Sequence, residues 1–257
     1  MRRDETCVLK TAAWMLGVLT LTSALTSVRA QEPPATEEEA EPRWQGKAGL
    51  AFLLTSGNTE TESLGVDLYL VRKPDPWGLE LNAQLQRAED GGVRTAERYL
   101  LSLRGTRAVT EHWEVFAGAL GEQDEFAGLE LRTLVEAGFV TRAFTGPKHH
   151  LAFDLGLSWT DEDRVPPEPD TDSVGAIAGV AYEWEFSETA SFTERLIYHA
   201  NFDDSDDWRV DSTTALSASL SARWALQLSY ELRYRNRPIG DRDDTDATTK
   251  ASLVVKL

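Results

Sequence analysis

Four histidines are the side chains of this 257-residue chain best suited to acid–base chemistry near neutral pH. His112 and the pair His149–His150 lie beside expected short turns, whereas His199 lies toward the other end of its segment, on the polar face. A serine near His199 could complete a Ser–His pair suited to cleaving lipid esters. The sequence contains neither a GxSxG nucleophile elbow nor an HExxH zinc motif. We therefore expect no enzyme and keep a lipid-acting enzyme as an alternative.

Two runs of aspartate could offer oxygen ligands to calcium or magnesium. They comprise Asp203, Asp204, Asp206 and Asp207 in one run, and Asp241, Asp243, Asp244 and Asp246 in the other. Neither run follows the spacing of an EF-hand loop or of a glycine-rich calcium repeat. Solvated, self-repelling loops explain both runs, so we expect no metal site and no cofactor. A further hypothesis is that divalent ions bridge these carboxylates to lipopolysaccharide phosphates.

Arginine and carboxylate side chains on the polar faces of alternating segments form a third candidate set. Opposite charges on neighbouring strands can pair across a sheet, and buried charges need such partners. The two signs are nearly balanced, which favours an interior filled with ion pairs over a channel selective for one sign. The predicted lining of the lumen comprises Glu80, Arg98, Arg104, Glu130, Arg132, Glu136, Arg142, Arg195, Glu231, Arg233 and Arg235, with Asp154, Arg209 and Asp211 on the same faces.

The elements that must position these residues are β-strands, because apolar and polar residues alternate with a period of two from Trp44 onward. Turn signals divide this region into about twelve segments, longer than the roughly 5–6 residues usual in soluble sheets. The expected strands lie near residues 44–55, 62–72, 77–88, 95–108, 112–122, 129–144, 149–160, 173–186, 191–202, 208–221, 224–236 and 246–257.

The connections between these segments fall into two alternating classes. Short turns are expected at 73–76, 110–112, 145–148, 187–190 and near Arg223. Longer, acidic connections are expected at 56–61, 88–93, 122–128, 161–172, 203–207 and 240–246. This sorting is typical of outer-membrane barrels, whose short turns face the periplasm and whose long loops face outward.

Seven of the eight tryptophans fall near the ends of the expected strands. Aromatic rings at the two interfaces of a membrane-spanning barrel would produce this distribution, whereas core tryptophans would show no such preference. The predicted membrane-interface aromatics are Trp44, Trp77, Trp113, Trp159, Trp184, Trp208 and Trp224.

Residues 1–30 have the pattern of a secretory signal peptide. Basic residues precede an apolar stretch at 11–28, and Val28 and Ala30 occupy the small-residue positions before the expected cleavage. Cys7 is the sequence's one cysteine and would leave with this segment. Residues 31–43 are rich in proline and glutamate and are expected to form a disordered, acidic tail. The folded domain is therefore expected over residues 44–257.

The stretch from Trp44 through TSGNTET at 55–61 resembles the opening of a family known as salt-induced outer-membrane proteins, or YdiY-like proteins. The resemblance extends over nearly all of 44–257. Its further matches are TAERYLLSLRG at 95–105, DEFAGLELR at 124–132, EAGF at 136–139, SYELRYRNRP at 229–238 and TDATTKASL at 245–253. The resemblance implies an outer-membrane β-barrel and implies no activity, substrate or catalytic residue.

Together these patterns predict an all-β fold, a closed antiparallel transmembrane β-barrel of about twelve strands. The formal charge of −17 argues against a nucleic-acid partner, which requires a basic surface. We expect a non-enzymatic envelope protein of the bacterial outer membrane, structural or a narrow pore. It would contact outer-membrane lipid and lipopolysaccharide and would be inserted by the barrel-assembly machinery. The alternatives are a lipid-acting outer-membrane enzyme and a soluble periplasmic β-sandwich binding protein.

Overall fold

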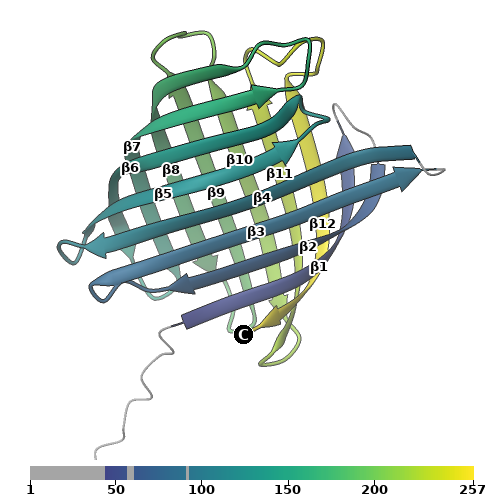
Figure 1. Ribbon diagram of the computed structural model, residues 1–257. Coiled ribbons are helices and arrows are strands. Elements are labelled where there is room, and N and C mark those ends of the chain that lie inside the picture. Colours follow the sequence, from purple (N-terminus) through teal and green to yellow (C-terminus); the bar gives the residue numbers. More distant parts are fainter. Residues whose placement is uncertain (1–43, 57–60, 91–92) are drawn as a thin grey trace, which may run out of the picture. The chain divides into compact units, whose positions relative to one another are not determined.

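A computed structural model describes residues 44–56, 61–90 and 93–257, which form a closed barrel of antiparallel strands (Figure 1). Each strand pairs with its neighbours in the chain, and pairing of the first strand with the last, from Lys47 opposite Lys256 to Ser56 opposite Ala247, closes the ring. This confirms the predicted fold class.

The described residues contain no helix long and apolar enough to cross a membrane. The strands are β1 (Trp44–Ser56), β2 (Thr61–Arg72), β3 (Trp77–Asp90), β4 (Val93–Ala108), β5 (Trp113–Asp124), β6 (Leu129–Thr145), β7 (His149–Arg164), β8 (Thr171–Glu185), β9 (Ala190–Asn201), β10 (Arg209–Ser219), β11 (Trp224–Arg235) and β12 (Thr245–Lys256).

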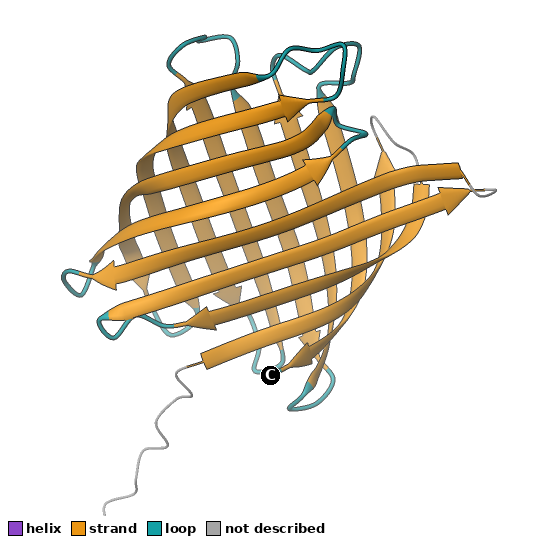
Figure 2. Ribbon diagram, in the orientation of Figure 1, coloured by secondary structure: helices purple, strands orange, loops and turns teal. Residues whose placement is uncertain are grey.

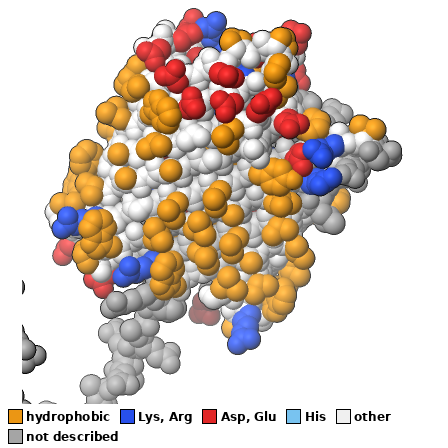
Figure 3. Space-filling model, viewed as in Figure 1, with side chains coloured by type: hydrophobic (Ala, Val, Ile, Leu, Met, Phe, Trp, Pro, Cys, Tyr) orange, Lys and Arg blue, Asp and Glu red, His pale blue; other side chains and the backbone are white. Residues whose placement is uncertain are grey.

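The alternation of residues places apolar side chains outside the barrel and polar side chains inside. In β7, Leu155 and Leu157 are 65% and 61% exposed, whereas Ser158, Thr160 and Glu162, which follow on the alternate positions, are buried. The space-filling view shows apolar side chains spread over the wall and acidic side chains gathered at one end (Figure 3). A soluble protein would bury such leucines, so this exposure pattern is that of a barrel whose wall faces lipid.

Short and long connections lie at opposite ends of the barrel (Figure 2). Residues 73–76, 109–112, 146–148, 186–189 and 220–223 form the short turns, and residues 165–170, 202–208 and 236–244 form longer loops at the opposite end. Residues 125–128, which were expected to belong to a longer connection at 122–128, form only a four-residue turn at that end, because β5 extends to Asp124. The connections 57–60 and 91–92 lie outside the described residues. The first described residue and the C-terminus both lie at the short-turn end, because an even number of antiparallel strands returns the chain to its starting side.

Two short turns share one side-chain hydrogen-bond pattern. Thr110 Oγ1 accepts hydrogen bonds from the backbone N–H groups two and three residues further on, at 3.3 and 3.1 Å. Ser221 Oγ does the same at the same two distances. In both turns the second donor is a tryptophan, Trp113 or Trp224, that begins the next strand. The hydroxyl thus fixes the bend and places an exposed indole at this end of the barrel.

Several strands extend further than the sequence predicts. β5 continues to Asp124 and β7 to Arg164, whereas the acidic residues there suggested loops from 122 and 161. Pairing with the neighbouring strand supplies the backbone hydrogen bonds that local composition does not predict. Glu122 and Glu162 consequently lie in the barrel wall. The predicted signal peptide and acidic tail, at 1–30 and 31–43, lie outside the described residues.

Candidate functional site in the lumen

Glu122 of β5 is a carboxylate shared by three arginines inside the barrel. It accepts hydrogen bonds from Arg98 at 2.7 Å, Arg132 at 3.1 Å and Arg233 at 3.2 Å. The alternation of β5 turns this side chain inward, and it is buried. A buried carboxylate is costly to desolvate, and several charge-assisted hydrogen bonds offset that cost.

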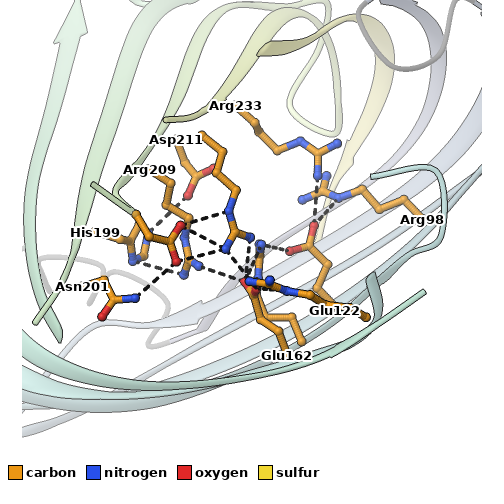
Figure 4. A network of polar contacts seen from close by, with 12 residues as sticks. Arg98, Glu122, Glu162, His199, Asn201, Arg209, Asp211 and Arg233 are labelled. Carbon is orange, nitrogen blue, oxygen red and sulfur yellow. Dashed lines mark hydrogen bonds and ion pairs between the residues drawn. The ribbon is translucent and has the colours of Figure 1, made fainter. Parts of the chain in front are cut away.

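Glu162 of β7 forms a second shared carboxylate. It bonds Arg132 at 3.0 Å, Arg235 at 2.9 Å and Arg164 at 2.8 Å. Arg209 lies 3.7 Å from it. Because Arg132 contacts both Glu122 and Glu162, the two carboxylates belong to one connected network, drawn in Figure 4.

This network crosses the lumen rather than joining only neighbouring strands. β5 and β11 lie six places apart in the ring of twelve strands, which is halfway around it. Arg233 of β11 nevertheless reaches Glu122 of β5 at 3.2 Å, and Arg98 of β4 lies 3.7 Å from Glu231 of β11. Side chains from opposite walls therefore meet in the interior and occupy the lumen at this level (Figure 4).

His199 lies inside this network. Its Nε2 atom is 3.2 Å from Asp211, and its Nδ1 atom is 3.4 Å from Arg209. The polar pocket beside it, bounded in part by Ser158 and Asn201, holds about 30 Å³, which is room for one or two water molecules. The structure thus brings His199 close to hydroxyl groups, in a space too small for a lipid.

A smaller group of charges lies nearer the short-turn end. Arg104 bonds Asp154 at 2.9 Å, lies 3.9 Å from Glu136, and stacks on the Phe116 ring at 3.6 Å. Arg195 lies 3.6 Å from Asp154 and is partly exposed. These contacts join β4, β6, β7 and β9 across the interior.

Lys250 of β12 and Glu231 of β11 complete the interior pairs on the remaining wall. Their charged atoms lie 2.8 Å apart, and Asp67 of β2 lies 3.6 Å from the same ammonium group. Lys250 is almost fully buried, at 2% exposure. A lysine with so little water requires its carboxylate partners.

Three connections at the long-loop end of the barrel are tied together, namely the β5–β6 turn, the β7–β8 loop and the β11–β12 loop. Arg242, in the β11–β12 loop, donates hydrogen bonds to the backbone carbonyls of Phe126 at 3.0 Å and Ile239 at 3.2 Å. Gly128 has a φ of +89°, and a side chain there would meet the Arg242 guanidinium. The Gly128 carbonyl also accepts a hydrogen bond from Val165 of the β7–β8 loop, at 3.0 Å. These contacts hold the loops against one another above the ion-paired interior.

The remaining predicted lining residues divide into three cases. Arg142 pairs with buried Glu114 at 2.5 Å on the neighbouring strand β5. Glu80 accepts a hydrogen bond from Tyr69 inside the barrel. Glu130, in contrast, is exposed, because a register shift between Leu129 and Leu131 interrupts the alternation of β6. The prediction that Glu130 lines the lumen is therefore corrected.

The tryptophans lie near the two ends of the wall. Trp44, Trp77, Trp113 and Trp224 are each the first residue of a strand at the short-turn end, and all are exposed. Exposed Trp184 lies near the same end and stacks with His149, with ring centroids 5.7 Å apart. Trp159 lies in the half of β7 nearer the long loops. Trp208 precedes β10 at the long-loop end and contacts the rings of Tyr198 and Tyr234.

The two aspartate runs are engaged by the protein itself. Asp207 bonds Arg235 at 3.1 Å, Asp204 pairs with Arg237, and Asp246 lies 3.8 Å from Arg233. Within the described residues, no group of three or more carboxylate, histidine or cysteine side chains could hold a metal ion. The hypothesis of a bridge to lipopolysaccharide phosphates stays a prediction.

The sequence did not single out the two shared carboxylates as interior residues. Glu122 and Glu162 fall in segments that composition assigns to acidic loops. A signal was present, since Ser158, Thr160 and Glu162 continue the period-two polar face of β7. Following that period through the acidic residues would have placed Glu162 inside the barrel.

A closed antiparallel barrel with an apolar outer wall and an ion-paired interior is a barrel of the outer-membrane porin type. The family described as "Protein of unknown function, DUF481" matches residues 48–257, and the chain belongs to this family. The uncharacterized protein YdiY of Escherichia coli (strain K12) is 24% identical over 217 residues, covering 83% of each chain. The resemblance to YdiY-like proteins is thereby confirmed.

One solved porin structure shows the same fold. The NanC porin superposes with a TM-score of 0.56 at 10% identity, covering 82% of this chain and 100% of the porin chain. A bacterial polysaccharide outer-membrane secretin superposes with a TM-score of 0.48 at 8% identity, covering 83% and 98% of the two chains. At such low identity, the likeness to NanC supports the barrel architecture alone.

Proposed function

We propose that this protein is a non-enzymatic envelope barrel of the bacterial outer membrane, with a lumen too narrow for the solutes that an open porin passes. The contact between Glu122 and Arg233, from strands on opposite sides of the ring, is the observation that carries this proposal. The apolar outer wall supports insertion into a membrane. The tryptophans near the strand ends are suited to the two membrane–water interfaces. The long loops would face outward and the short turns the periplasm.

Conductance in a planar lipid bilayer tests the narrow lumen. We expect the wild-type protein to give little or no steady ion current, and the double variant Glu122→Gln/Arg233→Gln to give a clearly larger one, because the cross-lumen pair is lost. The matched control is Glu114→Gln/Arg142→Gln, which removes an ion pair between the neighbouring strands β5 and β6. A large, stable wild-type current, or equal currents from both double variants, would contradict the proposal.

The absence of enzymatic activity is part of the same proposal. Both ring nitrogens of His199 face charged partners, and the adjacent pocket admits only water. Purified protein in mixed lipid micelles should therefore release no fatty acid above the rate of a boiled sample, and His199→Ala should not change that rate. Release of fatty acid by the wild type and its loss in His199→Ala would instead support the lipid-acting enzyme.

A further inference from the structure

The β11–β12 loop, residues 236–244, forms a strap across the mouth of the barrel at the long-loop end. It leaves the ring between β11 and β12, whereas the β5–β6 turn at 125–128 lies six places away among the twelve strands, on the opposite side. Arg242 of the strap nevertheless donates hydrogen bonds to the carbonyls of Phe126 at 3.0 Å and Glu125 at 3.4 Å. Connections on opposite sides of a ring meet over its opening, so the strap crosses the mouth.

The strap also reaches the other described connections at this end. Arg237 pairs with Asp204 of the β9–β10 loop. A Cβ atom added to Gly240 would lie 3.1 Å from a carboxylate oxygen of Glu168 in the β7–β8 loop. Figure 1 shows the strap, in yellow, beside the green β7–β8 loop at the top of the barrel. With the β5–β6 turn, the strap therefore touches all three of the other connections that the structure describes at this end.

The strap is folded against the β5–β6 turn rather than solvated. Ile239 of the strap is only 4% exposed, whereas loop side chains generally lie at the surface. Gly240 of the strap and Gly128 of the turn have φ values of +63° and +89°, and a Cβ atom on either would lie no more than 3.5 Å from the Arg242 guanidinium. Glycine adopts this backbone conformation at little cost, so strap and turn close around one arginine side chain. Arg242 is thus a latch between them.

A second set of contacts joins the same two hairpins below the latch. Arg233 of β11, close to the start of the strap, bonds Asp124 at 3.0 Å and Glu122 at 3.2 Å. Asp124 also accepts a hydrogen bond from the backbone N–H of Ala127 at 3.1 Å, so the same carboxylate holds the turn that Arg242 binds. The β5–β6 and β11–β12 hairpins are therefore joined at two levels, by the latch at the mouth and by ion pairs in the interior.

We propose that the strap is a lid, a second barrier in series with the ion-paired interior, and that release of Arg242 from the β5–β6 turn opens the mouth. The latch is the weaker of the two barriers. Its acceptors are neutral carbonyls, whereas breaking the interior pairs leaves buried charges without partners. The proposal rests on the proposed narrow lumen and adds to it the element that closes the mouth.

Single-channel recording in planar bilayers tests the latch. Arg242→Gln removes it. Arg237→Gln is the matched control, because Arg237 lies in the same strap but pairs with the adjacent β9–β10 loop instead of the opposite side of the ring. Both substitutions are made in the wild type and in the Glu122→Gln/Arg233→Gln variant, which lacks the cross-lumen pair. Heat-modifiable gel mobility verifies that each variant is folded.

In the variant without the cross-lumen pair, Arg242→Gln should raise the fraction of time spent conducting about tenfold, because losing a charge-assisted hydrogen bond shifts an equilibrium by at least that factor. Arg237→Gln should change that fraction less than about threefold, as expected for an exposed ion pair. In the wild type, Arg242→Gln alone should leave the small current unchanged, since the interior pairs still block the lumen.

A covalent tie between strap and turn is an independent test. Ala127→Cys/Asp241→Cys, made in a Cys7→Ser background, places two cysteines beside the residues that the latch joins. A short bismaleimide should crosslink them within one chain and should abolish the current of the variant without the cross-lumen pair. The same reagent on Asp241→Cys alone should leave that current in place.

Equal conducting fractions for Arg242→Gln and Arg237→Gln, or an unchanged current after crosslinking, would overturn the lid. Failure of the crosslink to form would also overturn it, since strap and turn would then not be neighbours. A large wild-type current would instead contradict the proposed narrow lumen, and loss of that current on crosslinking would still support the lid.

Discussion

At the scale of single residues, Glu122 and Glu162 illustrate how one carboxylate can organise several arginines. Each accepts hydrogen bonds from three arginines, so removing either carboxylate leaves several buried positive charges facing one another. The loss of a buried partner generally costs more than the intact pair contributes, because the remaining charges stay desolvated. The stability of the barrel should therefore be sensitive to these two positions.

Glu162→Gln tests this sensitivity. We expect the free energy of unfolding to fall by about 3 kcal/mol, because the arginines around position 162 lose their shared negative charge. Urea unfolding of the protein in lipid vesicles, followed by tryptophan fluorescence, measures the change. Glu130→Gln is the matched control: Glu130 is exposed, and its substitution should change the stability by less than about 0.5 kcal/mol. Equal effects at the two positions would contradict the assignment of Glu162 as a shared interior carboxylate.

At the scale of the elements, glycines allow neighbouring strands to approach closely on the interior side. Gly175 of β8 is one such position, since a Cβ atom there would lie 1.9 Å from the carbonyl oxygen of Ala200 in β9. Gly138 and Gly156 face each other in register between β6 and β7, and each would place a Cβ against the opposite backbone. A methyl group at these positions requires the strands to separate.

Gly175→Ala should destabilise the barrel by about 2 kcal/mol, the usual cost of forcing an extra carbon into a packed position. The same urea titration in vesicles measures the effect. Gly121→Ala provides the comparison, because the space around that Cβ is open and its stability should stay close to that of the wild type. If both substitutions were tolerated equally, the close approach of β8 and β9 at Gly175 would not be a constraint on folding.

At the scale of the whole molecule, pairing of β1 with β12 leaves no free sheet edge. In hydrocarbon each unpaired backbone group costs several kcal/mol, so closure is the condition for spanning a membrane with strands. Closure also fixes which walls face each other, and so brings Glu122 and Arg233 together across the lumen. The closed strand order of the ring thus determines both the absence of a free sheet edge and the ion-pair network in the interior.

Membrane fractionation combined with gel mobility tests whether the protein lies in the outer membrane as a closed barrel. Expressed with residues 1–30 in a Gram-negative host, the protein should appear in the outer-membrane fraction and should migrate differently before and after boiling, because a closed barrel resists detergent. N-terminal sequencing of that material should begin at Gln31, the residue after the expected cleavage. A soluble fraction with no heat-dependent shift would support a periplasmic sandwich instead.

The sequence by itself determined the class of fold, the number of strands and the facing of most side chains. The period-two pattern is local, and in every strand of a barrel wall it indicates which side chains face outward and which face the interior. Short turns, long loops and tryptophans at strand ends added the direction of each strand. The approximate strand limits followed from turn composition, and errors occurred where acidic residues continued a strand, as at Glu122 and Glu162.

Tertiary structure alone decided which charges meet. Arg233 lies 3.8 Å from Asp246 on the neighbouring strand β12, and whether it also reaches Glu122 on the opposite wall depends on the diameter of the ring and on the register of every intervening strand. No local pattern encodes these quantities, since the register shift near Glu130 suffices to turn one side chain from the interior to the surface.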